Sequence, residues 1–278
     1  MRLISRSMRI PRMILGVALI AASSTLCHGF GKTFDPIIFT REARLIFVAK
    51  IVELRAQSVV AEPSQFLKGA YTGRQIQLPW EREKKWEFVP AEYRAGETLL
   101  VFAQSTGSVF EPVGGPEGTL DLDSPKHSAT LEIVRNIVLF DAVTDTDTKK
   151  NILAGMLNSK ERAIQLAGLH AISFGTPIPP KAFAGPISRL LKSADHQLAG
   201  NAVSLIAEAG DKSDVPAVIE LLASPHAHVA RSAHDTLVHW TGANIPVDLK
   251  KSPAERKKSI GDWTDWWTKN KEKVKLRR

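Results

Sequence analysis

The sequence predicts an α+β protein of more than one domain, in which a small β-barrel is followed by an α-solenoid of about three helix pairs. Three observations lead to this prediction. The first part of the chain contains short apolar segments separated by turn signals. The second part repeats one helix–turn–helix pattern at a nearly constant period. The length of 278 residues leaves room for about two domains, each able to bury a core.

The clearest copy of the helical pattern runs from Ser213 to Gly242. Apolar residues recur in both of its helices at the spacing of one helix face. They are Val215, Val218, Ile219 and Leu222 in the first helix, and Val229, Ala230, Ala233, Leu237 and Trp240 in the second. Ser213 or Asp214 is expected to cap the first helix, and Gly242 to end the second. Pro216 falls in the first turn, where its missing N–H costs nothing.

Two looser copies precede this one. The first helices of the three copies end at Leu157, Leu191 and Leu222, at spacings of 34 and 31 residues. Small residues such as Ala202 and Ala233 recur inside the second helices. The pattern covers residues 148–242 and resembles HEAT repeats, including the short kind found in the phycobilisome-lyase-like family. The resemblance implies stacked helix pairs and specifies function hardly at all; an ordinary helical bundle is the alternative.

Residues 30–124 are expected to form the β-barrel. Apolar or alternating segments between Gly and Pro residues predict about five short strands. They are residues 44–54, 58–61, 75–78, 98–103 and 118–122. The second strand is expected to break at Pro63, and a further element to end at Gly69.

The order of three phrases in this part, VAKIVE, FLKG and GETLLVFA, is similar to the OB-like barrels of the netrin and tissue-metalloproteinase-inhibitor type. Those inhibitors depend on disulfides and on an N-terminal cysteine. This chain has one cysteine, Cys27, so the inhibitory mechanism does not carry over. An immunoglobulin-like sandwich is the alternative fold.

Residues 125–147 are expected to connect the two parts. In the segment 128–142, apolar residues at helical spacing predict a helix buried between barrel and solenoid, with a strand as the alternative. They are Leu131, Val134, Val138 and Ala142, broadened by Ile133, Ile137 and Phe140. The linker 144–148 contains two aspartates and is expected to cap the first repeat.

Residues 243–278 are interpreted as a Trp-rich helix and a basic tail. Trp263, Trp266 and Trp267 lie at i, i+3 and i+4, which fits a helix that covers the open end of the last repeat. A ligand platform is the alternative for these tryptophans. The basic tail from Lys269 to Arg278 is expected to be solvated.

Residues 1–29 are predicted to be a signal peptide. Four arginines precede the apolar run Met13–Ala22, which is short for a membrane span. Cleavage is expected near Gly29, and an uncleaved signal anchor is the alternative. We therefore expect an exported bacterial protein, in the periplasm, in the cell envelope or secreted, without another membrane-spanning segment.

The charge of the chain argues against nucleic acid as the partner. The formal net charge is +8, from 37 basic and 29 acidic residues. Removal of the four arginines of the signal segment leaves 33 − 29 = +4. Aromatic and basic residues do alternate between Trp80 and Phe88, but three glutamates in the same segment cancel the charge. This segment is therefore interpreted as an exposed loop.

One polar stripe in the last repeat is the candidate binding site. His228, Arg231, Asp235 and His239 lie within a narrow stripe roughly opposite the apolar face of their helix. The stripe is read as a binding ridge, as a His–Asp pair able to hold a metal, or as a solvated helix face. Because the sequence places no third ligand, we predict no metal site. We also predict no cofactor and no catalytic residues.

The sequence thus predicts a non-catalytic binding or scaffold protein whose partner is another protein. The alternative is a hydrolase inhibitor or an accessory subunit of an enzyme that acts through the barrel. A lyase-type enzyme is suggested only by the phycobilisome-lyase likeness of the repeats.

Overall fold

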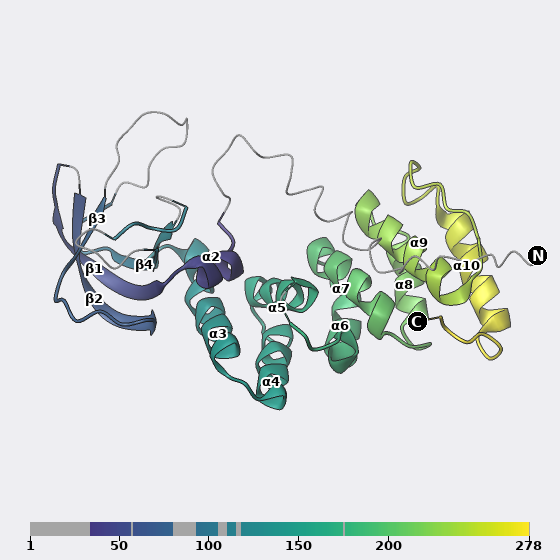
Figure 1. The fold of residues 1–278 in the computed structure, drawn as a ribbon. Coiled ribbons are helices and arrows are strands. Elements are labelled where there is room, and N and C mark those ends of the chain that lie inside the picture. Colours follow the sequence, from purple (N-terminus) through teal and green to yellow (C-terminus); the bar gives the residue numbers. More distant parts are fainter. Residues whose placement is uncertain are drawn as a thin grey trace, which may run out of the picture. The chain divides into compact units, whose positions relative to one another are not determined.

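Five β-strands and nine α-helices make up the part of the chain that the structure, a computed structural model, describes: residues 34–56, 58–79, 93–104, 110–114, 118–174 and 176–277. The strands form one antiparallel sheet, and all but one of these helices follow it in the sequence (Figure 1). Apolar side chains form one core cluster in the sheet and another among the helices. The α+β class is therefore confirmed.

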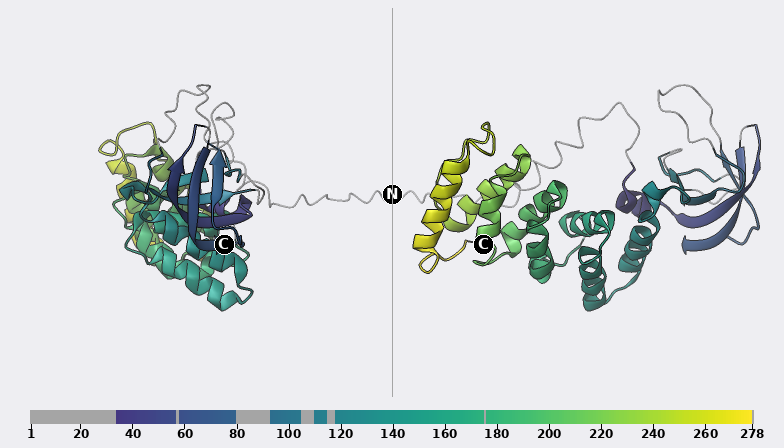
Figure 2. Two further views of the ribbon diagram at one scale, coloured as in Figure 1. Left: turned by 90° about the vertical axis from the view of Figure 1, so that its left-hand side faces the viewer. Right: turned by 180° about the vertical axis from the view of Figure 1, so that it is seen from behind.

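The sheet is curled into a half-barrel, with its strands in the order β3-β2-β1-β4-β5 (Figure 2). The strands are β1 (Leu45–Leu54), β2 (Ser58–Lys68), β3 (Ile76–Pro79), β4 (Thr98–Ala103) and β5 (Thr119–Asp121). The sequence predicts a closed barrel, but β3 and β5 form no ladder among the described residues. Both strands are short and offer few ladder hydrogen bonds. Beside β3, the Phe110 N–H donates to the Gln77 carbonyl oxygen at 3.0 Å.

Strand β2 is longer than its sequence suggests, because Pro63 does not end it. Val48 of β1 pairs with Gln65, whereas the next residue, Ala49, pairs with Pro63, so the register shifts around Ser64. Such a bulge lets a strand accommodate a residue without an N–H donor. Gly69, whose φ of 70° suits glycine, follows the strand end.

The central strand β1 is buried on both faces over its first five residues. On one face Phe47 contacts Phe66 and Phe110. On the other side, Phe39 of helix α2 (Pro36–Glu42) meets Phe102 of β4 edge to face at 6.0 Å. Helix α2 is not evident in the sequence, because seven residues are too few to show a helical period. Its signals are Asp35, which caps Ile37 and Ile38, and a proline at the first helical position.

Helix α3 (Thr130–Ala142) connects the sheet to the helices that follow, and the strand alternative is wrong. Its buried face contains Ile133, Val134, Ile137 and Phe140, whereas Ala142 is exposed. The buried face of α3 is therefore rotated around the helix axis from the predicted face, which is centred on Leu131, Val134 and Val138. α3 contacts β2 as well as α4 and α5. The Arg135 guanidinium donates to Gln65 Oε1 at 3.0 Å.

Six helices follow as three pairs, joined within each pair by a short turn (Figure 1). The pairs are α4 (Thr146–Leu157) with α5 (Arg162–Phe174), α6 (Ala184–Leu191) with α7 (His196–Ala209), and α8 (Val215–Leu221) with α9 (Ala227–Thr241). Each first helix contacts its second helix, α5 packs on α7, and α7 packs on α9. The linker caps α4 as predicted, with Asp145 accepting from the Thr148 N–H at 2.6 Å.

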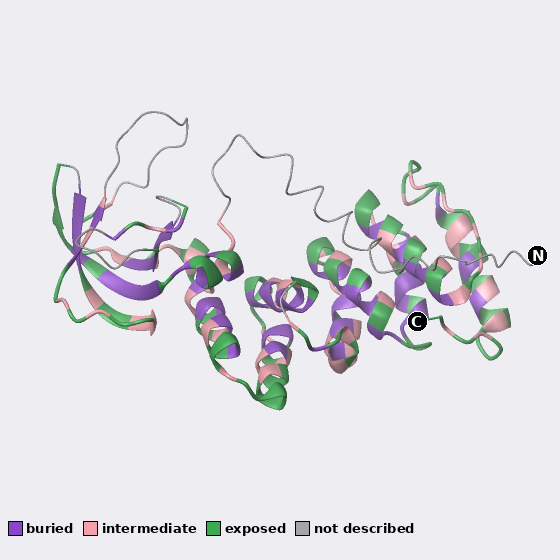
Figure 3. Ribbon diagram, in the orientation of Figure 1, coloured by how far each residue is buried: buried purple, intermediate pink, exposed green. Residues whose placement is uncertain are grey.

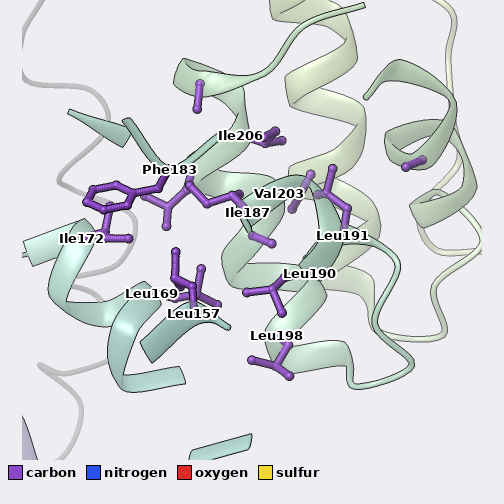
Figure 4. Close-up of a cluster of buried hydrophobic side chains, with 14 of the residues drawn as sticks. Leu157, Leu169, Ile172, Phe183, Ile187, Leu190, Leu191, Leu198, Val203 and Ile206 are labelled. Carbon is purple, nitrogen blue, oxygen red and sulfur yellow. The ribbon is translucent and has the colours of Figure 1, made fainter. Parts of the chain in front are cut away.

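The buried residues of these helices lie on the sides that face neighbouring helices (Figure 3). Leucine and isoleucine side chains from α5, α6 and α7 form one cluster (Figure 4). Phe183, which lies in the short 3₁₀ helix Pro180–Phe183, packs at one side of this cluster beside Ile172 and Ile187. Burial of these side chains is the main favourable contribution to folding of this part.

Asp214 precedes α8, but its carboxylate accepts from the Asp211 N–H instead of capping the helix.

Helix α10 (Lys257–Asn270) packs on α8 and buries Trp263 and Trp267. The described charged residues of the tail that follows are exposed, as expected, but the tail also contacts the helices. Val274 and Leu276 pack against the helical core, and the Arg277 N–H donates to the Trp240 carbonyl oxygen at 2.9 Å. The prediction of a solvated tail misses the alternation of apolar and basic residues, which lets one side of an extended chain pack.

Candidate binding surface on the helix pairs

The four residues of the predicted ridge all lie on the exposed side of α9. His228, Arg231, Asp235 and His239 are exposed, whereas Val229, Ala233, Leu237 and Trp240 are buried. Beside this stripe, Nδ1 of the half-buried His234 lies 3.7 Å from Asp235 Oδ1. Across the described residues, no group of three or more His, Cys, Asp or Glu side chains is arranged to hold a metal ion.

The structure adds a histidine that the sequence analysis does not connect with the ridge. His196, the first residue of α7, stacks on His226, the residue before α9, with ring centroids 3.6 Å apart. The His228 ring lies 6.4 Å and 6.0 Å from these two rings. Partial burial, and then the two neighbouring imidazoles, lower the pKa of His226. The signal for this cluster is that both stacked histidines occur where the second helix of a copy begins.

The turn of each helix pair contacts the turn of the next. Arg162, at the start of α5, forms an ion pair with Asp195, the N-cap residue of α7, and also donates to Gln197. Arg189 of α6 donates to Asn158 in the preceding turn. We call the surface formed by the turns 158–161, 192–195 and 222–226, with the first residues of α5, α7 and α9, the turn edge.

A buried arginine holds the third turn. Arg256 is 3 % exposed, and its guanidinium donates to the carbonyl oxygens of Leu222 and Ser224 at the C-terminal end of α8. Those carbonyls have no partner within the helix, and a positive charge there is favoured by the helix dipole. Arg256 therefore fixes the turn that carries His226.

The turn edge contains a positively charged pocket. A pocket of about 380 Å³ between the first two turns has Arg189 and Lys192 in its wall, with no carboxylate among its lining residues. The remaining lining residues are Leu157, Asn158, Gln165, Leu190 and Ser193. The helix dipoles add no net charge here, because α5, α7 and α9 begin at this edge while α4, α6 and α8 end at it. The positive charge of the pocket therefore comes from Arg189 and Lys192.

The contact between Arg162 and Asp195 predicts a specific pH dependence of stability. The hydrogen bond from Arg162, followed by the backbone N–H of Leu198, lowers the pKa of Asp195 to about 2. Because the pKa in the folded state is below the unfolded value of about 3.9, the contribution is present above that value and is lost as the pH falls toward about 2. The pair is partly exposed, so we expect no more than about 1 kcal/mol.

The measurement is the free energy of unfolding of the wild type and of Asp195→Asn, which retains a capping side chain, between about pH 2 and pH 6. The wild type should be the more stable at the upper end, and the difference should vanish at the lower end. A difference that does not change with pH would contradict the assignment.

Several predicted features lie outside the described residues. They are the signal segment 1–29 with Cys27, and the aromatic and basic segment from Trp80 to Phe88. Within the described ranges, no helix combines the length and the hydropathy that a bilayer crossing requires.

The turn edge and the ridge thus form the candidate binding surface of the helix pairs. Comparison of the chain with protein-family models, with curated proteins and with solved structures found no match.

Proposed function

We propose that this chain is an exported, non-catalytic binding protein, and that its helix pairs form a HEAT-like solenoid that binds another protein. The observation that carries the proposal is the contact of each turn with the next, from Arg162–Asp195 to the stacked His196 and His226. Contacts that repeat from one pair to its neighbour are what a solenoid requires, and they leave a continuous line of polar side chains exposed. Export is inferred from the sequence of residues 1–29.

The charge of the pocket in the turn edge selects the kind of partner. Arg189 and Lys192 in the pocket favour carboxylates, and the ridge on α9 continues the polar surface with Arg231 and two histidines. A protein with an acidic face therefore fits best. The proposal includes no cofactor, no metal and no nucleic acid.

Site-specific photo-crosslinking of the full chain in its host tests this proposal. Benzoylphenylalanine replaces Lys192 on the turn edge or Arg231 on the ridge, and Asn151 on α4 is the matched control; all three residues are exposed. Discrete adducts with the same protein are expected from Lys192 and Arg231, and none from Asn151. Adducts of equal strength at all three positions, or none with a folded protein, would overturn the proposal.

A charge-reversal variant sharpens the test. Arg189→Glu combined with Lys192→Glu should lower the adduct yield at Arg231 about tenfold, because loss of a few charge contacts costs about 1.4 kcal/mol. Lys257→Glu combined with Lys258→Glu on α10, also exposed, serves as a control of the same charge change. Equal losses in both double variants would show a general charge effect instead of a specific surface.

For the N-terminal part, we propose an OB-like barrel. The support is the five-stranded order with β1 in the centre, and the hydrogen bond that brings Phe110 to β3. In the alternative function this sheet would engage a hydrolase. Benzoylphenylalanine at Lys50, an exposed residue of β1, distinguishes the two functions, because a hydrolase adduct there would favour the inhibitor.

A further inference from the structure

A second pocket lies at the C-terminal end of the helices, away from the turn edge in sequence. It has a volume of about 450 Å³ and is formed between the segment after α9 and helix α10. Its polar lining residues are Asn244, Asp262, Asp265, Lys269 and Asn270, and Trp266 lines it together with Ile245 and Pro246. No charge or contact of the proposed turn edge involves this pocket.

Trp266 differs from the other two tryptophans of α10. Trp263 and Trp267 are buried in the core that α10 shares with α8, whereas Trp266 is only partly buried and lines the pocket. The Trp266 ring meets Trp263 edge to face, with centroids 6.1 Å apart and an interplanar angle of 73°. The buried Trp263 therefore holds the partly exposed ring in a fixed orientation, as a binding platform requires.

The charges around the pocket are balanced. Asp262 forms an ion pair with Lys258 at 3.6 Å, and Asp265 shares the pocket wall with Lys269, four residues further along the helix. The wall itself holds two carboxylates and one ammonium group, and Lys258, outside the wall, offsets the charge of Asp262. An anionic ligand would meet the two carboxylates and a cationic ligand would meet Lys269, so a neutral ligand fits best.

The polar groups of the pocket wall indicate which neutral ligands could bind there. Carboxylates accept hydrogen bonds, an ammonium group donates them, and the amides of Asn244 and Asn270 do both. Hydroxyl groups can also donate and accept. A ligand with several hydroxyl groups and one apolar face for the Trp266 indole would satisfy these partners. A pyranose ring has both, since its axial C–H groups form an apolar face and its hydroxyls point outward.

We propose that this pocket is a binding site for a neutral saccharide. The C–H face of one sugar ring packs on the Trp266 indole, and its hydroxyls bond to the carboxylates of Asp262 and Asp265 and to the neighbouring amides. The site goes beyond the proposed protein-binding function and does not depend on it. No bond of the saccharide is broken.

The test begins with the full chain on an array of neutral, anionic and cationic glycans, followed by calorimetric titration with the neutral oligosaccharide that binds most strongly. Trp266→Ala should lower the affinity about tenfold, and Trp266→Phe should retain more than Trp266→Ala, because a stacked aromatic ring contributes about one factor of ten. Asp265→Asn, a change at an exposed position, should also weaken binding. Thr264→Ala on the same helix, outside the pocket lining, should bind like the wild type.

Binding only of charged glycans, no binding of any neutral glycan, or unchanged affinity in a folded Trp266→Ala protein would each overturn the proposal. If Trp266→Ala does not fold, Asp265→Asn decides the question, since its side chain is exposed. The variant Arg189→Glu with Lys192→Glu should bind the saccharide normally. This outcome separates the saccharide site from the surface proposed for the protein partner.

Discussion

Replacement of Trp240 by alanine is expected to lower the free energy of unfolding by about 3 to 5 kcal/mol. The side chain is 1 % exposed and lies in the core between α9 and α7. Its Nε1–H donates at 2.8 Å to the carbonyl oxygen of Ala207, in the last turn of α7, where carbonyls have no partner within the helix. The variant would therefore leave a cavity and an unsatisfied carbonyl in the same place.

The close approach of Gly210 to Trp240 adds a second reason for a large effect. A Cβ at Gly210 would lie 2.7 Å from two carbons of the Trp240 ring. Residue 210 is therefore a glycine, and it has no side chain that could move into the cavity left by Trp240→Ala. Denaturant unfolding of Trp240→Ala, of Trp240→Phe and of the exposed control His239→Ala checks the prediction. Trp240→Phe should lose less, and His239→Ala should stay within about 0.5 kcal/mol of the wild type. A loss below about 1 kcal/mol in Trp240→Ala would contradict the packing described here.

The second large effect is expected for Trp263→Ala, again about 3 to 5 kcal/mol. Trp263 is fully buried, packs against His234 of α9, and donates to the Ile245 carbonyl oxygen at 3.2 Å. His234 Nε2 also lies 3.1 Å from that carbonyl oxygen. Trp263 thus joins α10, α9 and the segment between them, and its loss should release α10 from α8.

Hydrogen exchange distinguishes this release from a general loss of stability. In Trp263→Ala the amides of α10 should lose most of their protection while those of β1 and β4 keep theirs, because local opening then requires less free energy than global unfolding. The exposed neighbour Thr264 provides the matched control, and Thr264→Ala should behave like the wild type. Equal loss of protection in sheet and helices would show that α10 does not open as a separate unit.

The elements that the sequence predicts well are those with a clear period. The strand at 98–103 and the helices around Leu157, Leu191 and Leu222 agree with the structure because side chains alternate or recur by local geometry alone. The structure of β2 and α2 differs from what the sequence predicts, because neither element shows a clear period over its whole length. A bulge absorbs Pro63, and a seven-residue helix is too short to show a period.

The candidate site divides in the same way. The exposed side of α9 follows from the spacing of Val229, Ala233 and Trp240, which are buried opposite it. The stacking of His196 on His226 does not follow, because the residues come from different helix pairs. Periodicity also cannot separate Trp266 from Trp263 and Trp267, since all three share one side of α10.

The sequence by itself determined the α+β class, the succession of helix pairs along the chain and the apolar face of most helices. These properties depend on neighbours within a few residues, through helical and strand periodicity and through capping. Only the tertiary structure decided which turns meet, which tryptophans are buried and where the two pockets lie. Those properties arise when residues far apart in the chain pack together, and packing depends on the shapes of both surfaces, which no local pattern contains.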